Sequence, residues 1–195
     1  MNQDHPNVIV IGGPNGSGKS TAAPILLREY LRVTEFVNAD VIAQGLSAYG
    51  AENVAFKAGR IMLERNQELA EARADFAFET TLAAKSFATR LSQLRTVGYR
   101  AHLIFLWLPS AEMAIARVAN RVQCGGHYVP DEVVRRRYSA GLHNFLKLYR
   151  PIVDSWRIFD NSVPAGYELI AEESRESGLR VVNDGTWTTM LRGVP

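Results

Sequence analysis

The stretch GGPNGSGKST, residues 12–21, decides the fold of this 195-residue chain. It fits the pattern G-x-x-x-x-G-K-[ST] in full, follows the apolar run at 8–11 (VIVI) and opens a stretch with a helical pattern at 20–32. Glycines let the backbone curl so that its N–H groups face one point, and the start of the following helix favours an anion there. We expect a phosphate-binding loop in which Lys19 reaches the terminal phosphates of a nucleotide and the Ser20 hydroxyl completes a Mg²⁺ site.

The whole loop is expected to contact the nucleotide. A glycine-rich turn with a chance lysine is the alternative, but strand, loop and helix follow one another in the order that phosphate binding requires. The expected nucleotide-binding residues of the loop are Gly13, Pro14, Asn15, Gly16, Ser17, Gly18, Lys19, Ser20 and Thr21.

Composition limits the class of protein and its partners. Hydrophobic residues make up 47% of the chain and charged residues 22%, which is typical of a globular protein, and the length favours a single domain over residues 1–195. The net charge is only +2, with 22 basic and 20 acidic residues, so there is no overall basic field for long nucleic acid.

Cysteine content and hydropathy predict the compartment. Cys124 is the only cysteine, which excludes an internal disulfide and a metal site built from cysteines. The first residues, MNQDHPN, lack a signal pattern, and the longest run of large apolar residues, 103–108, is too short to cross a bilayer. We expect a cytoplasmic protein with no membrane partner.

Short apolar segments alternate along the chain with longer periodic stretches. This alternation predicts an α/β fold with a parallel sheet, helices on both faces and ligands at the carboxyl ends of the strands. The segment at 101–108 is the most apolar and is expected to be a central strand. The expected strands are 8–11, 35–39, 76–79, 101–108 and 156–159; the expected helices are 20–32, 52–73, 84–97 and two more separated by GGHYVP at 125–130; a terminal hairpin would pair 168–173 with 179–183.

The loop alone leaves open whether the terminal phosphate is hydrolysed for work, used as a switch or transferred. GTPases and motor ATPases usually end a buried strand with an acidic residue, but the strand at 101–108 is followed by proline, and no Asn-Lys-x-Asp sequence is present to bind guanine. The carboxylate stands instead in FVNAD, as Asp40, where it could accept the proton of a hydroxyl that attacks the γ-phosphate. The alternative, that Asp40 caps the next helix, is compatible with catalysis.

The segment FAFETT, residues 76–81, also ends in polar groups. Glu79 and Thr81 are suited to hydrogen-bond a polyhydroxylated acceptor. A solvent-facing glutamate followed by two threonines of a turn is the alternative.

Residues 117–137 are expected to form a helical lid. Two helices bearing arginines, among them Arg121 and the trio 135–137, flank the glycine-containing loop at 125–130. A planar guanidinium can grip the oxygens of a phosphate in transfer, and closure of a lid excludes water.

The sequence resembles the zeta-toxin family of P-loop kinases, in its shorter bacterial form, over about residues 8–162. FETT together with the GGHYVP loop is more specific than the phosphate loop, which many enzymes share. The segments that carry the resemblance occur in this order: GGPNGSGKST, FVNAD followed by IAQGLS, FAFETTL, FLWLPS, RVANRVQCGGHYVP, RRRY and IFDNS.

The resemblance implies a P-loop kinase fold and ATP-dependent, Mg²⁺-dependent phosphorylation of an activated sugar, typically UDP-N-acetylglucosamine on the 3′-hydroxyl of the sugar. By this resemblance Asp40 is the catalytic base, Lys19 and Ser20 hold the nucleotide and Mg²⁺, and Glu79 and Thr81 contact the acceptor.

The resemblance also assigns phosphate clamps and a nucleotide contact. Arg121 and one arginine of the trio 135–137 would grip the phosphates, and Arg137 is preferred because it directly precedes Tyr138. Asn161 follows the last core strand, where related kinases run a loop past adenine, and is assigned to the nucleotide. A small helical antitoxin that occupies the nucleotide site is the partner that the resemblance implies.

Two other functions stay open at the level of sequence. One is a kinase for another small hydroxyl acceptor, such as a nucleoside, an antibiotic or a polynucleotide end. The other is a nucleotide-binding regulatory module without transferase activity.

Overall fold

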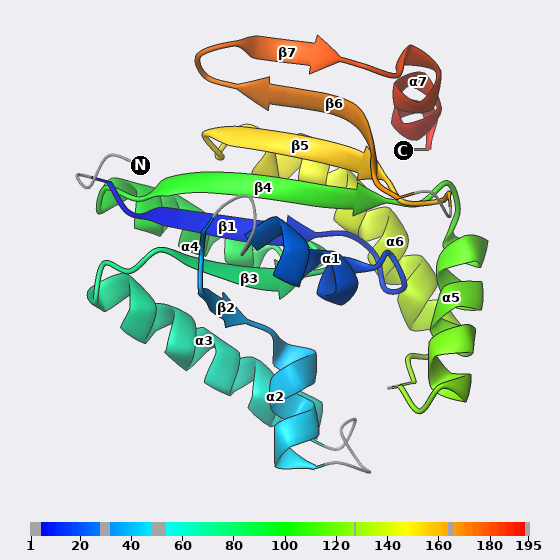
Figure 1. The fold of residues 1–195 in the computed structure, drawn as a ribbon, viewed down its shortest axis with the longest axis horizontal. Coiled ribbons are helices and arrows are strands. Elements are labelled where there is room, and N and C mark those ends of the chain that lie inside the picture. The colour runs from blue at the N-terminus through cyan, green and yellow to red at the C-terminus, as the bar shows by residue number, and fades with distance from the viewer. Residues whose placement is uncertain (1–4, 28–31, 48–53, 127, 164–165, 194–195) are drawn as a thin grey trace.

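The computed structural model describes residues 5–27, 32–47, 54–126, 128–163 and 166–193. In this part of the chain seven strands form one sheet in the order β2-β3-β1-β4-β5-β6-β7 (Figure 1). The strands are β1 (Asn7–Gly12), β2 (Glu35–Val37), β3 (Phe76–Thr80), β4 (Arg100–Trp107), β5 (Ser155–Asp160), β6 (Glu168–Ser174) and β7 (Gly178–Val181).

The first five strands are parallel, which confirms the expected α/β fold. β4 lies in the middle of the sheet, as its apolar sequence predicted. The expected terminal hairpin is also confirmed, because β6 pairs with β7 in antiparallel fashion. β6 in turn pairs antiparallel to β5, so the hairpin extends the parallel sheet instead of standing apart from it.

Helices, with a π-helical turn after α6, follow the strands. The terminal helix α7 was not expected from the sequence, and α2 was implied only by the alternative in which Asp40 caps the next helix. Parts of the expected helices at 20–32 and 52–73 lie outside the described residues, at 28–31 and 52–53. The helical segments are α1 (Lys19–Ile25), α2 (Ala39–Leu46), α3 (Ala55–Glu71), α4 (Ser86–Thr96), α5 (Ala111–Gln123), α6 (Asp131–Asn144), the π-helical turn Phe145–Tyr149 and α7 (Asp184–Arg192).

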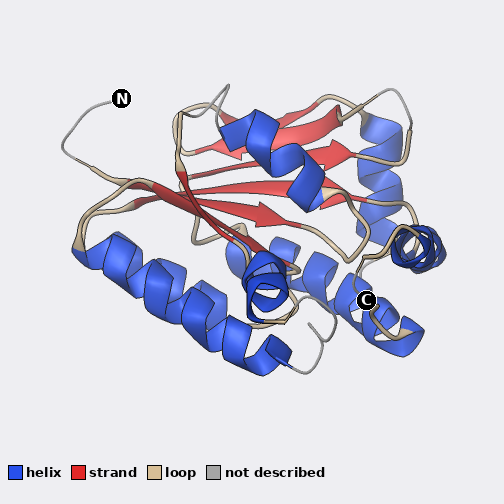
Figure 2. Ribbon diagram, turned by 60° about the horizontal axis from the view of Figure 1, so that its bottom comes forward, coloured by secondary structure: helices blue, strands red, loops and turns tan. Residues whose placement is uncertain are grey.

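Both faces of the sheet are covered, because its central strands are apolar on both sides. Ile9 and Ile11 of β1 pack toward α1, whereas Val8 and Val10 point to the opposite face, where α3 and α4 lie (Figure 2). Successive side chains of a strand point to opposite faces, so a run of four apolar residues serves two cores.

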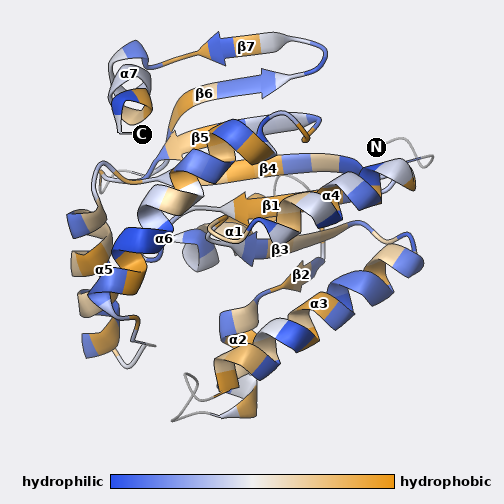
Figure 3. Cartoon of the chain, turned by 180° about the vertical axis from the view of Figure 1, so that it is seen from behind, coloured by the Kyte–Doolittle hydropathy of each residue, from blue (hydrophilic) through white to orange (hydrophobic). Residues whose placement is uncertain are grey.

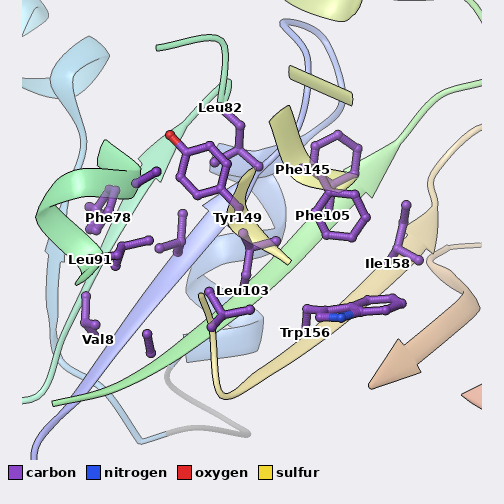
Figure 4. Close-up of a cluster of buried hydrophobic side chains, with 14 of the residues drawn as sticks. Val8, Phe78, Leu82, Leu91, Leu103, Phe105, Phe145, Tyr149, Trp156 and Ile158 are labelled. Atoms are coloured by element: carbon purple, nitrogen blue, oxygen red, sulfur yellow. The ribbon is translucent and has the colours of Figure 1, made fainter. Parts of the chain in front are cut away.

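The larger core reaches from α3 to the C-terminal helix. Phe105 of β4 and Phe145 of the π-helical turn stack with their ring centroids 4.9 Å apart (Figure 4). Trp156 of β5 stacks on Trp187 of α7 at 5.9 Å, which ties the unexpected last helix to the parallel sheet. None of the described helices is both long and apolar enough to cross a membrane.

Candidate active site

The phosphate loop joins β1 to α1 and is pressed against the end of β4. Gly13 has a φ of 143°, and a Cβ atom at this position would lie 2.4 Å from the carbonyl oxygen of Leu106. Only glycine fits both the backbone conformation and this close approach. Asn161, which follows β5, donates from its Nδ2 to the carbonyl oxygen of Ser17 over 2.8 Å, so its side chain braces the loop. Contact of Asn161 with adenine stays a prediction.

Lys19 stands at the start of α1 with only 6% of its side chain exposed. Its Nζ donates to the carbonyl oxygen of Pro14 over 2.8 Å and lies 3.7 Å from Oε1 of Glu79. Burial lowers the pKa of Lys19, while the carboxylates of Glu79 and Asp40 act in the opposite direction. A buried ammonium group beside a phosphate loop is placed to meet an anion.

Glu79 connects the loop to the neighbouring strand and helix. Parallel pairing of β3 with β1 brings Glu79 opposite Ile11, directly before the loop. Its Oε2 accepts hydrogen bonds from the hydroxyl of Ser20 and from Nδ2 of Asn38, each over 2.8 Å.

The contact between Ser20 and Glu79 tests whether the site fits the expected Mg²⁺ ion. The hydroxyl of Ser20 and the carboxylate of Glu79 are oxygen groups of the kind that bind Mg²⁺, which usually takes one or two carboxylates and completes its shell with phosphate oxygens and water. The two residues therefore fit a nucleotide-bound Mg²⁺.

Asp40 is the second residue of α2 and is not its cap. The cap is Asn38, whose Oδ1 accepts hydrogen bonds from the backbone N–H of Asp40 over 2.8 Å and of Val41 over 3.3 Å. The capping alternative for Asp40 is therefore wrong, because the asparagine two residues earlier already satisfies these N–H groups. The carboxylate of Asp40 is exposed in the cleft. Burial lowers the pKa of Arg137, as it does that of Lys19, and the charge of Asp40 acts in the opposite direction on both, so Asp40 lies near both cations.

The arginines of α5 and α6 differ in where they lie. Arg117 and Arg121 of α5 and Arg137 of α6 line the cleft, and Nη1 of Arg137 donates to Oδ1 of Asn15 in the loop over 3.4 Å. Arg135, in contrast, pairs with Glu112 on the exposed side of the helices. Arg136 is also exposed, so Arg137 is the member of the trio that reaches the cleft.

The expected lid comprises the second half of α5, the loop after it and the start of α6. Val118 and Val134 lie in a small core between the two helices, which keeps the segment next to the phosphate loop. His127 of the connecting loop lies outside the described residues. Closure of this segment stays a prediction.

One cleft of about 880 Å³ collects most of these groups, near the upper end of the usual range for small-molecule sites. In Figure 1, α2 and the start of α3 lie on one side of the carboxyl ends of the strands and α5 on the other. The expected residues that line the cleft are Asn15, Gly16, Gly18, Lys19, Ser20, Thr21, Asp40, Glu79, Thr81, Arg121 and Arg137. Those that support the loop from behind or lie outside the lining are Gly13, Pro14, Ser17 and Asn161.

Sequence reasoning missed one wall of the cleft entirely. A face of α3 beside its core stripe lines the cleft, together with Asn38 and the start of α4, and Met62 of the core stripe also reaches it. The sequence contained a pattern that could have predicted this wall. Phe56, Gly59 and Leu63 recur at helical spacing on α3, outside the stripe of residues that packs on the sheet. The missed lining residues are Asn38, Ala39, Ala55, Phe56, Gly59, Arg60, Met62, Leu63, Thr80, Ala84, Ser86, Phe87 and Arg117.

The part of the chain that carries the phosphate loop, Asp40, Glu79 and the arginine-bearing helix pair matches a known family. A profile of the family described as Zeta toxin matches residues 1–167. The chain belongs to the zeta toxin family. The likeness covers the phosphate loop, the α3 wall and the lid segment, and ends just before β6.

One relative by sequence and two solved structures are similar to this zeta toxin family member. An uncharacterized protein of Haemophilus influenzae (strain ATCC 51907 / DSM 11121 / KW20 / Rd) is 29% identical over 128 residues, which are 65% of this chain and 88% of the relative. The structure of AvrRxo1-ORF1:-ORF2 with ATP superposes with a TM-score of 0.74 at 17% identity, over 97% of this chain and 64% of that one. The PezAT chromosomal toxin–antitoxin system of Streptococcus pneumoniae superposes with a TM-score of 0.65 at 15% identity, over 98% of this chain and 85% of that one. The chain thus spans less than two thirds of the AvrRxo1 chain, and these two structures support the fold alone.

Proposed function

We propose that this protein is an ATP-dependent phosphotransferase that transfers the γ-phosphate to a hydroxyl of a nucleotide sugar such as UDP-N-acetylglucosamine. The observation that carries the proposal is the position of Asp40, whose carboxylate lies exposed in the cleft and faces Lys19 and Arg137 beside the phosphate loop. A carboxylate next to cations that hold a terminal phosphate is suited to transfer that phosphate to an alcohol.

ATP and Mg²⁺ would occupy the loop side of the cleft. Lys19 and the N–H groups of the loop would bind the β- and γ-phosphates, and Ser20 would hold Mg²⁺. Glu79, which the sequence assigned to the acceptor, is proposed to hold Mg²⁺ beside Ser20 because its carboxylate accepts from the Ser20 hydroxyl. The metal ion supplies positive charge that neutralises the phosphates. The choice of ATP is supported by family membership and by the relative AvrRxo1-ORF1:-ORF2, whose structure was solved with ATP.

The transfer then needs one base and a clamp. Asp40 accepts the proton of the acceptor hydroxyl, the hydroxyl oxygen bonds to the γ-phosphorus, and the bond to the β-phosphate oxygen breaks to release ADP. Arg121 and Arg137 stabilise the charge on the γ-phosphate oxygens during this step. Thr81 hydrogen-bonds the acceptor at the same end of β3.

A small helical antitoxin is proposed as a protein partner. PezAT is a toxin–antitoxin system, and AvrRxo1-ORF1 was solved together with AvrRxo1-ORF2. A helix that enters the cleft beside the phosphate loop would exclude ATP, so the antitoxin is expected to compete with the nucleotide.

The test is an assay of purified protein with ATP, Mg²⁺ and UDP-N-acetylglucosamine, read by mass spectrometry for a phosphorylated sugar nucleotide. Replacement of Asp40→Asn is expected to lower the rate about 100-fold or more, because general-base catalysis is lost. Asp131→Asn is the matched control, since Asp131 is an exposed residue in the first turn of α6 outside the cleft lining.

Each outcome bears on a different part of the proposal. A rate of Asp40→Asn within tenfold of wild type rejects the general-base role. ADP without the sugar product rejects the nucleotide sugar and favours another hydroxyl acceptor. Absence of both ADP and product, with ATP still bound, rejects catalysis and favours a regulatory nucleotide-binding module.

A further inference from the structure

The cleft extends well beyond the groups that the phosphates require. The face of α3 that lines it carries Phe56, Gly59, Arg60 and Leu63, one or two helical turns apart. We propose that this α3 wall is the binding subsite of the acceptor, and that it selects acceptors carrying both a planar ring and an anionic group. The inference rests on the proposed function and deepens it, because nucleotide sugars belong to this class whereas simple sugars and polyols do not.

The position of the wall assigns it to the acceptor. α2, which bears Asp40, packs against the start of α3, as Figure 3 shows. Arg117 and the loop-bracing Asn161 lie across the phosphate loop, next to β5. A molecule on the α3 wall therefore lies on the side of the proposed base, where an attacking hydroxyl has to be.

The first feature of the wall is that it exposes large apolar side chains to solvent. Phe56 has 84% of its side chain exposed and Leu63 has 38%, although both line a concave site. Large apolar side chains exposed in a cleft are typical of ligand-binding surfaces. An exposed aromatic ring offers a stacking surface for a nucleobase.

The second feature is a glycine in α3 that no contact in the described part of the chain requires. Gly59 lies inside the 17-residue helix α3, where glycine lowers helix stability relative to alanine. A Cβ atom built on Gly59 has no atom within 4 Å, so no neighbouring chain forbids a larger residue. The open space belongs to the cleft, and an acceptor lying close to the helix backbone would fill it.

The third feature is a charge available to a ligand. Arg60 is exposed, lies one turn after Phe56 and has no hydrogen bond or ion pair with any described residue. A guanidinium binds phosphate through two parallel hydrogen bonds. Ring and cation together match a nucleoside phosphate.

The test measures acceptor binding directly, without turnover. A non-hydrolysable ATP analogue and Mg²⁺ occupy the loop, and calorimetry follows the titration of UDP-N-acetylglucosamine or of uncharged N-acetylglucosamine. We expect Phe56→Ala and Arg60→Gln each to weaken binding of the nucleotide sugar about tenfold or more, with affinity for the ATP analogue unchanged. Lys57→Gln, an exposed residue of α3 outside the cleft lining, is the matched control and should bind like wild type.

Gly59→Leu separates binding from folding. Leucine favours helix, so the variant should melt at or above the wild-type temperature, yet binding of the nucleotide sugar should fall about tenfold or more because the side chain enters the acceptor space. Unchanged binding by Gly59→Leu, Phe56→Ala and Arg60→Gln overturns the α3 wall as a subsite. Equal affinity of wild type for the free sugar and the nucleotide sugar overturns the proposed selectivity.

Failure of the proposed function gives a different result. If wild type does not bind UDP-N-acetylglucosamine, uridine 5′-monophosphate and gluconate are titrated next under the same conditions. Binding of uridine 5′-monophosphate that depends on Phe56 and Arg60 supports the wall although the acceptor is not that sugar. Preference for gluconate, or binding of neither compound, overturns the wall.

Discussion

Lys19 is the residue whose environment most directly links folding to ligand binding. Its ammonium group is buried with one carbonyl contact and a carboxylate 3.7 Å away, and burial lowers its pKa. A lowered pKa means that the charged form of Lys19 is disfavoured in the folded protein. At a pH below 10.5, the ordinary pKa of lysine, this lowers the stability of the folded protein. A bound triphosphate favours the charged form and reverses this effect.

ATP binding should therefore take up protons at alkaline pH. Below the lowered pKa, Lys19 is already charged, so affinity for ATP is at its maximum; affinity then falls as the pH rises through the lowered pKa toward 10.5. Calorimetry in two buffers of different ionisation enthalpy measures the proton uptake. Lys19→Met should abolish the uptake, and uptake that persists in this variant would assign it to another group.

Glu79 is the second residue that we propose for the Mg²⁺ site, beside Ser20. Its carboxylate accepts from Ser20 and Asn38, so the neutral variant Glu79→Gln keeps the size of the side chain but removes the charge. We expect the Mg²⁺ concentration for half-maximal activity to rise about 10- to 100-fold. Glu132→Gln, exposed on α6 outside the cleft lining, is the control. An unchanged Mg²⁺ requirement would remove Glu79 from the metal site.

At the scale of elements, α6 and the π-helical turn after it hold the loop between β3 and α4. Nδ2 of Asn144 donates to the carbonyl oxygen of Leu82 over 2.8 Å, and Leu82 has a positive φ of 60°. The hydroxyl of Tyr149 donates to the carbonyl oxygen of Ala84 over 2.6 Å, and burial raises the pKa of Tyr149 to about 12, so the phenol stays a donor. Gly141 of α6 allows this approach, because a Cβ there would lie 2.4 Å from the carbonyl oxygen of Thr81.

Asn144→Ala should loosen the loop that carries Thr81. Loss of the donor leaves the carbonyl of Leu82 unpaired in a buried place, so we expect a loss of about 1–3 kcal/mol in the free energy of unfolding. The KM for the acceptor should rise while the KM for ATP stays near wild type. Asn120→Ala, exposed on α5, controls for substitution of an asparagine. Parallel changes in both KM values would point to general destabilisation instead of positioning of Thr81.

At the scale of the whole molecule, the terminal hairpin and α7 share the larger core with the parallel sheet. Trp187 and Met190 of α7 are buried with Trp156 and Ile158 of β5 in the same cluster. The cleft lies at the carboxyl ends of the parallel strands, on the far side of β5 from this packing. α7 itself contributes no residue to the cleft lining.

Trp187→Ala is expected to destabilise the protein without changing transfer. Removal of a buried indole costs about 3–5 kcal/mol, and denaturant unfolding followed by circular dichroism measures the loss. The kcat of folded protein should stay within twofold of wild type. Leu191→Ala, a partly exposed neighbour on α7, should cost far less. A second unfolding transition in the wild type would contradict a shared core.

Local sequence determined the fold class, the phosphate loop and the residues at the strand ends, because each depends on short-range pattern. VIVI followed by GGPNGSGKS predicts strand, loop and helix without reference to the rest of the chain. FAFETT puts Glu79 at the end of β3, and FVNAD puts Asp40 just after β2, in the first turn of α2. α7 was missed because it is only nine residues long, and packing of Trp187 on Trp156 holds it in place.

Only the tertiary structure decided which side chains meet. Asn38 instead of Asp40 caps α2, since the cap depends on backbone conformation at one residue. Arg137 instead of Arg135 reaches the loop, since successive helical residues point in different directions and packing of α5 on α6 selects among them. The α3 wall could be recognised only in the tertiary structure, where β2 and β3 bring that helix beside the phosphate loop. The residue pattern of a helix shows which side chains share a face, but not which part of the protein that face lies against.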